Sequence, residues 1–173
     1  IIDLVDLVAG SETDLKILKT MEKFYLGMNK KPVVFERFIS GYVANRLQAA
    51  MGLEITKLLD EGWASAKVID NSIKYGLALR MALTGSLMKA DFAGLELMQQ
   101  GKANMTYDPP TPKRGSPVLD RLLASGRKGV MSGAGYFDYG DMTPTELFRN
   151  RDLGLLRLKD QVAQIEEEYP LGS

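Results

Sequence analysis

An asparagine on a line of small side chains is the first feature whose residue types and spacing could support chemistry. The stretch 41–60 contains no proline, and a helical wheel places Asn45, Ala49, Gly52 and Thr56 on one stripe. Small side chains let a second backbone or a flat ligand come close, and the amide of Asn45 can both donate and accept a hydrogen bond. Two interpretations follow: a helix–helix crossing, which is the commoner use of such a stripe, or a ligand site.

The 173 residues include no histidine and no cysteine. Histidine is the commonest general base and a common zinc ligand, so the chain alone cannot perform histidine-dependent acid–base catalysis. The absence of cysteine excludes disulfides and thiolate metal sites, and we expect no bound metal.

The charges of the chain balance, because Lys and Arg total 22 and Asp and Glu total 22. Without a basic excess, we expect neither nucleic acid nor an anionic membrane as a partner. No apolar run approaches the roughly 20 residues that span a bilayer, and a cytoplasmic location is compatible with this composition.

Glu54 falls inside the wide apolar face of the same predicted helix. Burying a carboxylate costs several kcal/mol unless it is paired. Glu54 is therefore expected either at the helix edge beside a lysine or arginine, or in a buried pair with Arg80 of another helix.

The opening segment, Ile1 to Ala9, mixes β-branched apolar residues with acids and predicts a strand. Its only candidate partner is the short run Pro32 to Phe35. We therefore interpret residues 1–9 as one piece of a sheet whose remainder precedes this chain.

Helical patterns dominate the rest of the sequence and predict an all-α architecture of about six helices. Caps and breakers mark the ends: Ser65 begins a helix that Gly76 should stop, Pro117 opens one that Gly126 ends, and Thr143 begins a capping box with Glu146. The predicted helices cover residues 14–28, 41–60, 66–75, 83–100 and 117–125, followed by a helical tail with a break near Asp152 and Gly154.

The segment Gly133-Ala134-Gly135 is not a dinucleotide fingerprint, because it lacks a preceding strand and a third glycine at the required spacing. It is interpreted as a tight turn that sets Tyr136 and Phe137 into the core.

Four segments resemble, in the same order, the C-terminal domain of the 3-hydroxyacyl-CoA dehydrogenases. They correspond to the family's K-P-V-V and P-G-F-I-x-N-R-L, its L-x-E-E-G-V-A-S-x-x-D-I-D, its G-L-G-x-R with G-P-F and A-D-L-x-G-L-D, and its G-x-x-G-x-K-T-G-x-G-F-Y-D-Y. In this chain they are Lys31 to Val34 with Gly41 to Leu47, Leu58 to Asp70, Tyr75 to Leu95, and Gly126 to Tyr139. Ser40, Ser86 and Leu87 depart from the pattern, which leaves the acyl-chain preference open.

The resemblance implies a multi-helix domain like the C-terminal fold of 6-phosphogluconate dehydrogenase, with a short N-terminal strand left from a Rossmann domain. Residues 1–9 would be the remnant of the last Rossmann strand, and residues 10–173 would form the helical dimerisation and substrate domain. NAD would be bound mainly by the preceding Rossmann domain. The implied partners are an acyl-CoA substrate, that Rossmann domain and a second copy in a homodimer.

The resemblance also assigns roles to two residues. Asn45 matches the family's asparagine beside the 3-oxygen of the substrate and the catalytic histidine, in agreement with the small-residue stripe. Asp6 takes the place of the glutamate that partners that histidine, on an arm one methylene shorter. The histidine itself would lie just before Ile1, and the site residues expected here are Asn45 and Asp6.

The expected function of the full-length protein is NAD-dependent oxidation of an L-3-hydroxyacyl-CoA, such as 3-hydroxybutyryl-CoA, to the 3-ketoacyl-CoA in fatty acid β-oxidation. The chain alone should be inactive. Two alternatives stay open: an L-gulonate-type dehydrogenase of the same superfamily, and a non-catalytic helical dimerisation module. The residues that precede Ile1 would separate these alternatives.

Overall fold

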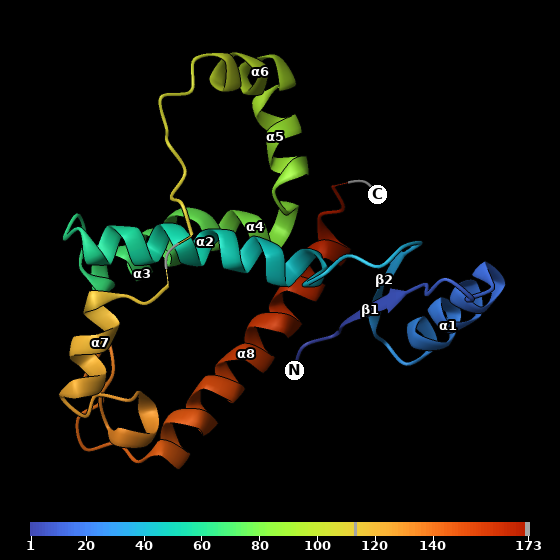
Figure 1. The fold of residues 1–173 in the computed structure, drawn as a ribbon. Coiled ribbons are helices and arrows are strands. Elements are labelled where there is room, and N and C mark those ends of the chain that lie inside the picture. The colour runs from blue at the N-terminus through green and yellow to red at the C-terminus, as the bar shows by residue number, and fades with distance from the viewer. Residues whose placement is uncertain (113, 172–173) are drawn as a thin grey trace. The chain divides into compact units, whose positions relative to one another are not determined.

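The structure, a computed structural model, describes residues 1–112 and 114–171, so the last two residues of the predicted helical domain lie outside it. Contacts within the chain define two compact units, Ile1–Gly52 and Leu53–Ser173. Helices dominate and a strand lies near the N-terminus, which confirms the predicted fold class (Figure 1).

The first unit opens with a strand, a helix and a second strand. Strand β1 (Leu4–Val8) pairs in parallel with β2 (Lys31–Phe35), and α1 (Leu15–Gly27) connects them. Asp14 begins α1, because its carboxylate accepts a hydrogen bond from the backbone N–H of Lys16 at 2.8 Å. Leu7, Ala9 and Leu18 form the buried core between the strands and the helix. This arrangement is a parallel βαβ unit.

β1 therefore pairs with a strand of this chain, whereas the sequence analysis expected the remainder of its sheet to precede the chain. The ladder continues beyond the strand, where the N–H of Ala9 donates to the carbonyl of Phe35 at 2.9 Å. At the other end, Lys30 and Asp3 form an ion pair of 3.1 Å. The run Pro32 to Phe35 was recognised as strand-like, but its pairing depends on the return of the chain through α1, which local patterns do not encode.

Helix α2 (Tyr42–Asp60) is continuous across the boundary between Gly52 and Leu53. Its predicted length is confirmed to within one residue. None of its side chains is buried, and Val43, Leu47 and Met51 on its predicted apolar face are exposed. The predicted apolar face is therefore exposed at these three positions, whereas Ile55 and Leu58 on the same face are partly buried.

The second unit contains a run of short helices, two of which are separated from the next helix by a glycine with positive φ. The run comprises α3 (Ala66–Asn71), the π-helix η1 (Ser72–Ala78), α4 (Leu79–Thr84), α5 (Leu87–Ala93) and α6 (Leu95–Ala103). Gly85 and Gly94 have φ of 62° and 93°, so the single helix predicted over 83–100 is wrong and is divided at these two glycines. The predicted stop at Gly76 is also wrong, because the chain passes through it in the π-helix.

The remaining helices begin where their caps predict. Ser116 caps α7 (Pro117–Ala124) by accepting the N–H of Leu119 at 3.2 Å. A short 3-10 turn, η2 (Val130–Ser132), precedes α8 (Pro144–Glu168), which opens with the predicted capping box. The predicted break near Asp152 and Gly154 is wrong, since α8 is uninterrupted. Across residues 1–112 and 114–171, no helix combines the length and the apolar character needed to cross a bilayer.

Candidate functional site

Asp6 lies in the middle of β1, half-buried and opposite Val33 in the parallel register. Its neighbours on the strand alternate sides, so Leu7 enters the core and Asp6 faces the other surface of the sheet. A carboxylate in this position is held by a rigid strand and is accessible from one side.

Asn45 lies exposed on the first turn of α2. The start of this helix is fixed by two hydrogen bonds: the N–H of Tyr42 donates to the carbonyl of Ile39 at 3.0 Å, and Arg46 donates to the carbonyl of Ser40 at 3.4 Å. Asp6 and Asn45 thus lie in the same unit, each on a regular element.

The turn before Asn45 contains a left-handed residue that sequence reasoning missed. Gly41 has φ of 77°, which glycine adopts freely, but Tyr42 has φ of 47°, which costs other residues about 1 kcal/mol. The ring of Tyr42 packs against Phe35 and Phe38, each with centroids 6.2 Å apart. This aromatic contact offsets the strain and fixes the start of the helix that carries Asn45.

The stripe of small residues on α2 has open space beside one of its members. A Cβ atom added at Gly52 would meet nothing within 4 Å beyond the backbone of its own helix. The packing interpretation of the stripe stays a prediction, as does the ligand interpretation.

A cavity of about 380 Å³ opens at the carboxyl ends of β1 and β2. Ligands of α/β sheets usually bind at this edge. The lining residues come from the β1–α1 turn and the segment after β2: Ala9, Gly10, Ser11, Thr13, Leu15, Glu36, Arg37 and Phe38.

This edge does not have the features of a dinucleotide cradle. The β1–α1 turn contains one glycine, Gly10, whose N–H donates to the hydroxyl of Thr13 at 2.9 Å. The N-terminus of α1, which would face a pyrophosphate, already carries the carboxylate of Asp14. A phosphate would meet negative charge there instead of free N–H groups, so this turn does not fit NAD.

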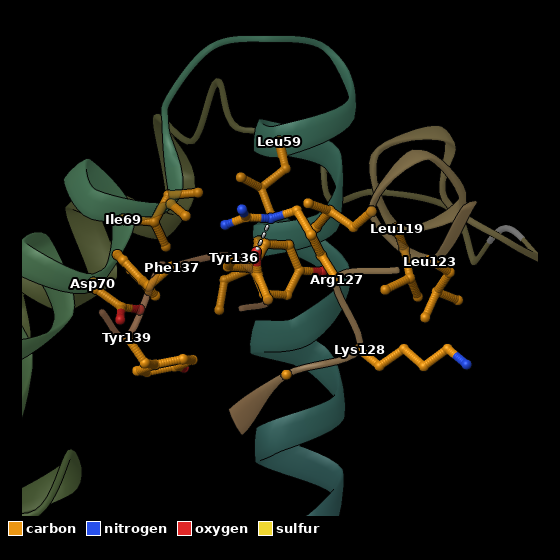
Figure 2. Close-up of a pocket in the computed structure, with 15 residues that line it drawn as sticks. Leu59, Ile69, Asp70, Leu119, Leu123, Arg127, Lys128, Tyr136, Phe137 and Tyr139 are labelled. Atoms are coloured by element: carbon orange, nitrogen blue, oxygen red, sulfur yellow. Dashed lines mark hydrogen bonds between the residues drawn. The ribbon is translucent and has the colours of Figure 1, made fainter. Parts of the chain in front are cut away.

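A second cavity, also of about 380 Å³, lies within the second unit. Figure 2 shows its lining of mostly apolar side chains from α2, α3 and α7, closed on one side by the loop that carries Tyr136 and Phe137. Arg127 braces this loop, donating to the carbonyl of Gly135 at 2.8 Å and to Asp138 at 2.6 Å. The predicted tight turn is present at Gly133, with φ of 73°, but Tyr136 is exposed and not in the core as predicted.

Glu54 has a partner other than the one proposed from the sequence. The hydroxyl of Tyr107 donates to its carboxylate at 2.7 Å, whereas Arg80 donates to the carbonyl of Gly76 on its own helix. This hydrogen bond to Glu54 is the main reason that the pKa of Tyr107 is raised. Ser116 donates to Asp60 at 2.6 Å, so two hydrogen bonds join the segment between α6 and α7 to α2.

The family of the chain follows from comparison with known proteins. A family model described as 3-hydroxyacyl-CoA dehydrogenase, C-terminal domain, matches residues 41–139. Because this match covers more than half of the sequence, the chain belongs to that family, as its motifs indicated.

Individual relatives agree with this assignment. An L-carnitine dehydrogenase from Oceanobacillus iheyensis is 35% identical over 54% of this chain and 31% of its own length. A probable 3-hydroxybutyryl-CoA dehydrogenase from Deinococcus radiodurans is 29% identical over 80% of this chain and 49% of its own length. The chain thus spans half or less of the length of these relatives.

A solved structure shares the fold. It is 5-formyl-3-hydroxy-2-methylpyridine 4-carboxylic acid 5-dehydrogenase, described as an NAD+-dependent dismutase. The TM-score is 0.83 over 94% of this chain and 53% of that chain, at 22% identity. At this level of identity, the likeness shows a common fold alone.

Proposed function

We propose that the protein containing this chain is an NAD-dependent dehydrogenase that oxidises the 3-hydroxyl group of an L-3-hydroxyacyl-CoA, and that this chain is its C-terminal part. The observation that carries the proposal is the family match, which runs from the start of the Asn45 helix to Tyr139. A second copy in a homodimer belongs to the same proposal.

The cofactor would be held outside this chain. The β1–α1 turn does not fit a dinucleotide, because Asp14 occupies the helix N-terminus. The boundary after residue 9 stays a prediction. We favour a boundary after β2, because β1, α1 and β2 share one core and the family match begins only at residue 41. The βαβ unit would then be the last part of a Rossmann domain whose earlier strands precede Ile1.

Within this proposal, Asn45 and Asp6 assist the removal of the substrate's hydroxyl proton. Removal of the substrate's hydroxyl proton needs a base, and the chain contains no histidine to supply it. Asp6, held on β1, would orient a histidine donated by the preceding domain. The exposed amide of Asn45 would donate a hydrogen bond to the oxygen on which negative charge develops, or hold that histidine in place.

The substrate could instead be a small hydroxy acid. This alternative is favoured by the carnitine dehydrogenase relative, whose named substrate carries a 3-hydroxyl group without coenzyme A. L-gulonate belongs to the same group of small substrates. All three candidates present a secondary alcohol, so the same two residues would serve each of them.

The test is turnover by the full-length protein with NAD and three substrates: L-3-hydroxybutyryl-CoA, L-carnitine and L-gulonate. We expect kcat/KM to be highest for the thioester, and we expect the chain of residues 1–173 alone to be inactive. A higher kcat/KM for carnitine or gulonate would identify that compound, instead of the thioester, as the substrate. Failure of all three to reduce NAD would count against the proposed dehydrogenase and favour the non-catalytic dimerisation module.

A further inference from the structure

The turn that joins β2 to α2 contains two consecutive residues in the left-handed region, Gly41 with φ of 77° and Tyr42 with φ of 47°. Glycine reaches this region without steric cost, but a bulky residue there is an outlier. Across residues 1–112 and 114–171, the other non-glycine residue with positive φ is Asn29, a residue type that tolerates it. Backbone strain of this kind persists only where the surrounding structure holds it, and it is concentrated at functional sites.

The side chain of Tyr42 shows what holds the strained turn. Its ring centroid lies 6.2 Å from that of Phe35, with the planes tilted by 35°, and 6.2 Å from that of Phe38, with the planes at 80°. Both separations fall within the range in which aromatic rings attract one another. Phe38 is 67% exposed, whereas Tyr42 and Phe35 are half-buried, so the contact with Phe35 is the inner one. A glycine at position 42 would relieve the strain but would also remove this contact.

Phe35 connects the ring of Tyr42 to the strand that carries Asp6. It is the last residue of β2, and its carbonyl accepts the N–H of Ala9, which directly follows β1, at 2.9 Å. The hydrogen bonds at the start of α2 connect residues 39–46 with one another, so they shape the turn itself. The contact of Tyr42 with Phe35, in addition, joins the start of the helix to the sheet.

We infer that Tyr42 is a positioning residue, whose ring against Phe35 sets where the amide of Asn45 lies relative to Asp6. All four residues belong to the first unit. Asn45 follows Tyr42 within the first turn of α2, so a change in the direction of the helix start moves its amide. A displacement of about 1 Å can lower turnover about 100-fold. The kinetic consequence rests on the proposed function, in which Asn45 and Asp6 assist proton removal, whereas the structural consequence does not.

The kinetic test uses the full-length protein with NAD and L-3-hydroxybutyryl-CoA. Tyr42→Phe keeps the ring and should leave kcat near the wild-type value. Tyr42→Ala and Tyr42→Gly both lose the ring and should lower kcat about 10-fold to 100-fold with KM little changed, because the lost contact acts in the transition state. Tyr42→Gly also relieves the strain, so wild-type kcat in this variant would overturn the inference, as would wild-type kcat in Tyr42→Ala beside a low kcat in Asn45→Ala.

A double substitution separates positioning from a general loss of stability. In the Asn45→Ala background, Tyr42→Ala should cause no further loss of kcat, because the group that Tyr42 positions is already missing. Losses that multiply would overturn the inference, since the two residues would then act independently. If Asn45→Ala alone leaves kcat unchanged, the proposed role of Asn45 fails, and hydrogen exchange decides the inference without it.

Hydrogen exchange on the same variants reports on the helix start without any substrate. The amides of residues 42–48 should exchange about 10-fold faster or more in Tyr42→Ala and Tyr42→Gly, and at the wild-type rate in Tyr42→Phe. The amides of β1 should stay protected in every variant, which confines the change to the helix start. Unchanged exchange of residues 42–48 in Tyr42→Ala would overturn the inference whatever the substrate is.

Two further variants complete the design. Phe24→Ala is the matched control, because Phe24 is 57% exposed on α1 and forms an edge contact with Tyr25 at 5.4 Å. It should leave kcat and the exchange of residues 42–48 unchanged, and an effect equal to that of Tyr42→Ala would overturn the inference. Phe35→Leu removes the partner ring but keeps an apolar side chain on β2, and it should reproduce the effect of Tyr42→Ala. If Tyr42→Ala does not fold, wild-type kcat and exchange in Phe35→Leu would overturn the inference instead.

Discussion

The position of Asn45 depends on Tyr42, whose structural role is not visible in the sequence. The stripe of small side chains pointed to Asn45, and the structure leaves it exposed. Tyr42, three residues earlier, adopts a left-handed conformation that depends on aromatic contacts with Phe35 and Phe38. Such contacts involve the end of β2 and the loop after it, so wheel projections of α2 cannot predict them. The same holds for the bond between Tyr107 and Glu54, which lie 53 residues apart.

Replacement of Asn45 by alanine tests the proposed role. Asn45→Ala should lower kcat of the full-length dehydrogenase by about 100-fold or more, because an oxyanion donor or a positioning contact is lost in the transition state. The matched control is Asn150→Ala, an exposed asparagine on α8, which should leave kcat unchanged. Steady-state kinetics at saturating substrate measure both. Equal turnover by Asn45→Ala and wild type would remove Asn45 from the site.

The loop around Gly135 gives a residue-scale prediction of stability. A Cβ atom at Gly135 would lie 2.9 Å from the Cα of Gly129, a backbone contact that cannot yield without moving the loop. Gly135→Ala should therefore lower the free energy of unfolding by about 1 to 3 kcal/mol, measured by urea denaturation at fixed protein concentration.

Gly154 provides the control for that measurement. It lies within α8 with nothing within 4 Å of an added Cβ. Gly154→Ala should stabilise the protein by about 0.5 to 1 kcal/mol through helix propensity. If both substitutions destabilise equally, the close approach to Gly129 is not the cause.

Among the helices, starts were easier to predict than ends. Ser116 and Thr143 each accept a backbone N–H three residues later, a local bond that the sequence encodes directly. Ends depend on the wider context. Gly76 does not stop a helix, because the guanidinium of Arg80 donates to its carbonyl and the backbone continues in a π-helix. Gly85 and Gly94 do break theirs, because both adopt positive φ.

The capping box of α8 has a pH-dependent component. Hydrogen bonds from the Thr143 hydroxyl and N–H hold the pKa of Glu146 below its usual value. A lowered folded-state pKa means that the stabilisation is present above the unfolded-state pKa and is lost as pH falls through the folded-state pKa. Thr143→Ala removes the N-cap oxygen, a change that typically costs about 1 kcal/mol, and it also removes the hydrogen bonds that lower the pKa of Glu146.

In acid, the difference between wild type and Thr143→Ala should shrink as Glu146 becomes protonated. Urea unfolding at neutral pH and at about pH 3.5, near and below the usual glutamate pKa, measures this change. Thr145→Ala, in the same first turn but outside the cap, should cost less than about 0.5 kcal/mol at either pH. A gap between Thr143→Ala and wild type that is equal at both pH values would exclude Glu146 from the effect.

On the scale of the whole molecule, the sequence predicts a mainly helical chain and its family but not its two contact units. The helical patterns correctly identified an apolar face on α2, yet its residues Val43, Leu47 and Met51 are exposed. Periodicity indicates that a helix face is apolar, but it does not indicate whether the residues that bury this face belong to the same chain. The parallel pairing of β1 with β2 was missed for a related reason, since strand pairing depends on contacts distant in sequence.

The π-helix Ser72–Ala78 lies between α3 and α4. Each turn of a π-helix holds about one residue more than an α-helical turn, which is the usual signature of a single inserted residue. Because the wide turn takes up that residue locally, removing one codon there would restore α-helical geometry and leave the downstream residues on the faces they occupy now. A lineage could thus lose one residue at this point while α4 and the helices after it kept their orientation, whereas the same deletion in a regular α-helix would turn the downstream part by about 100°.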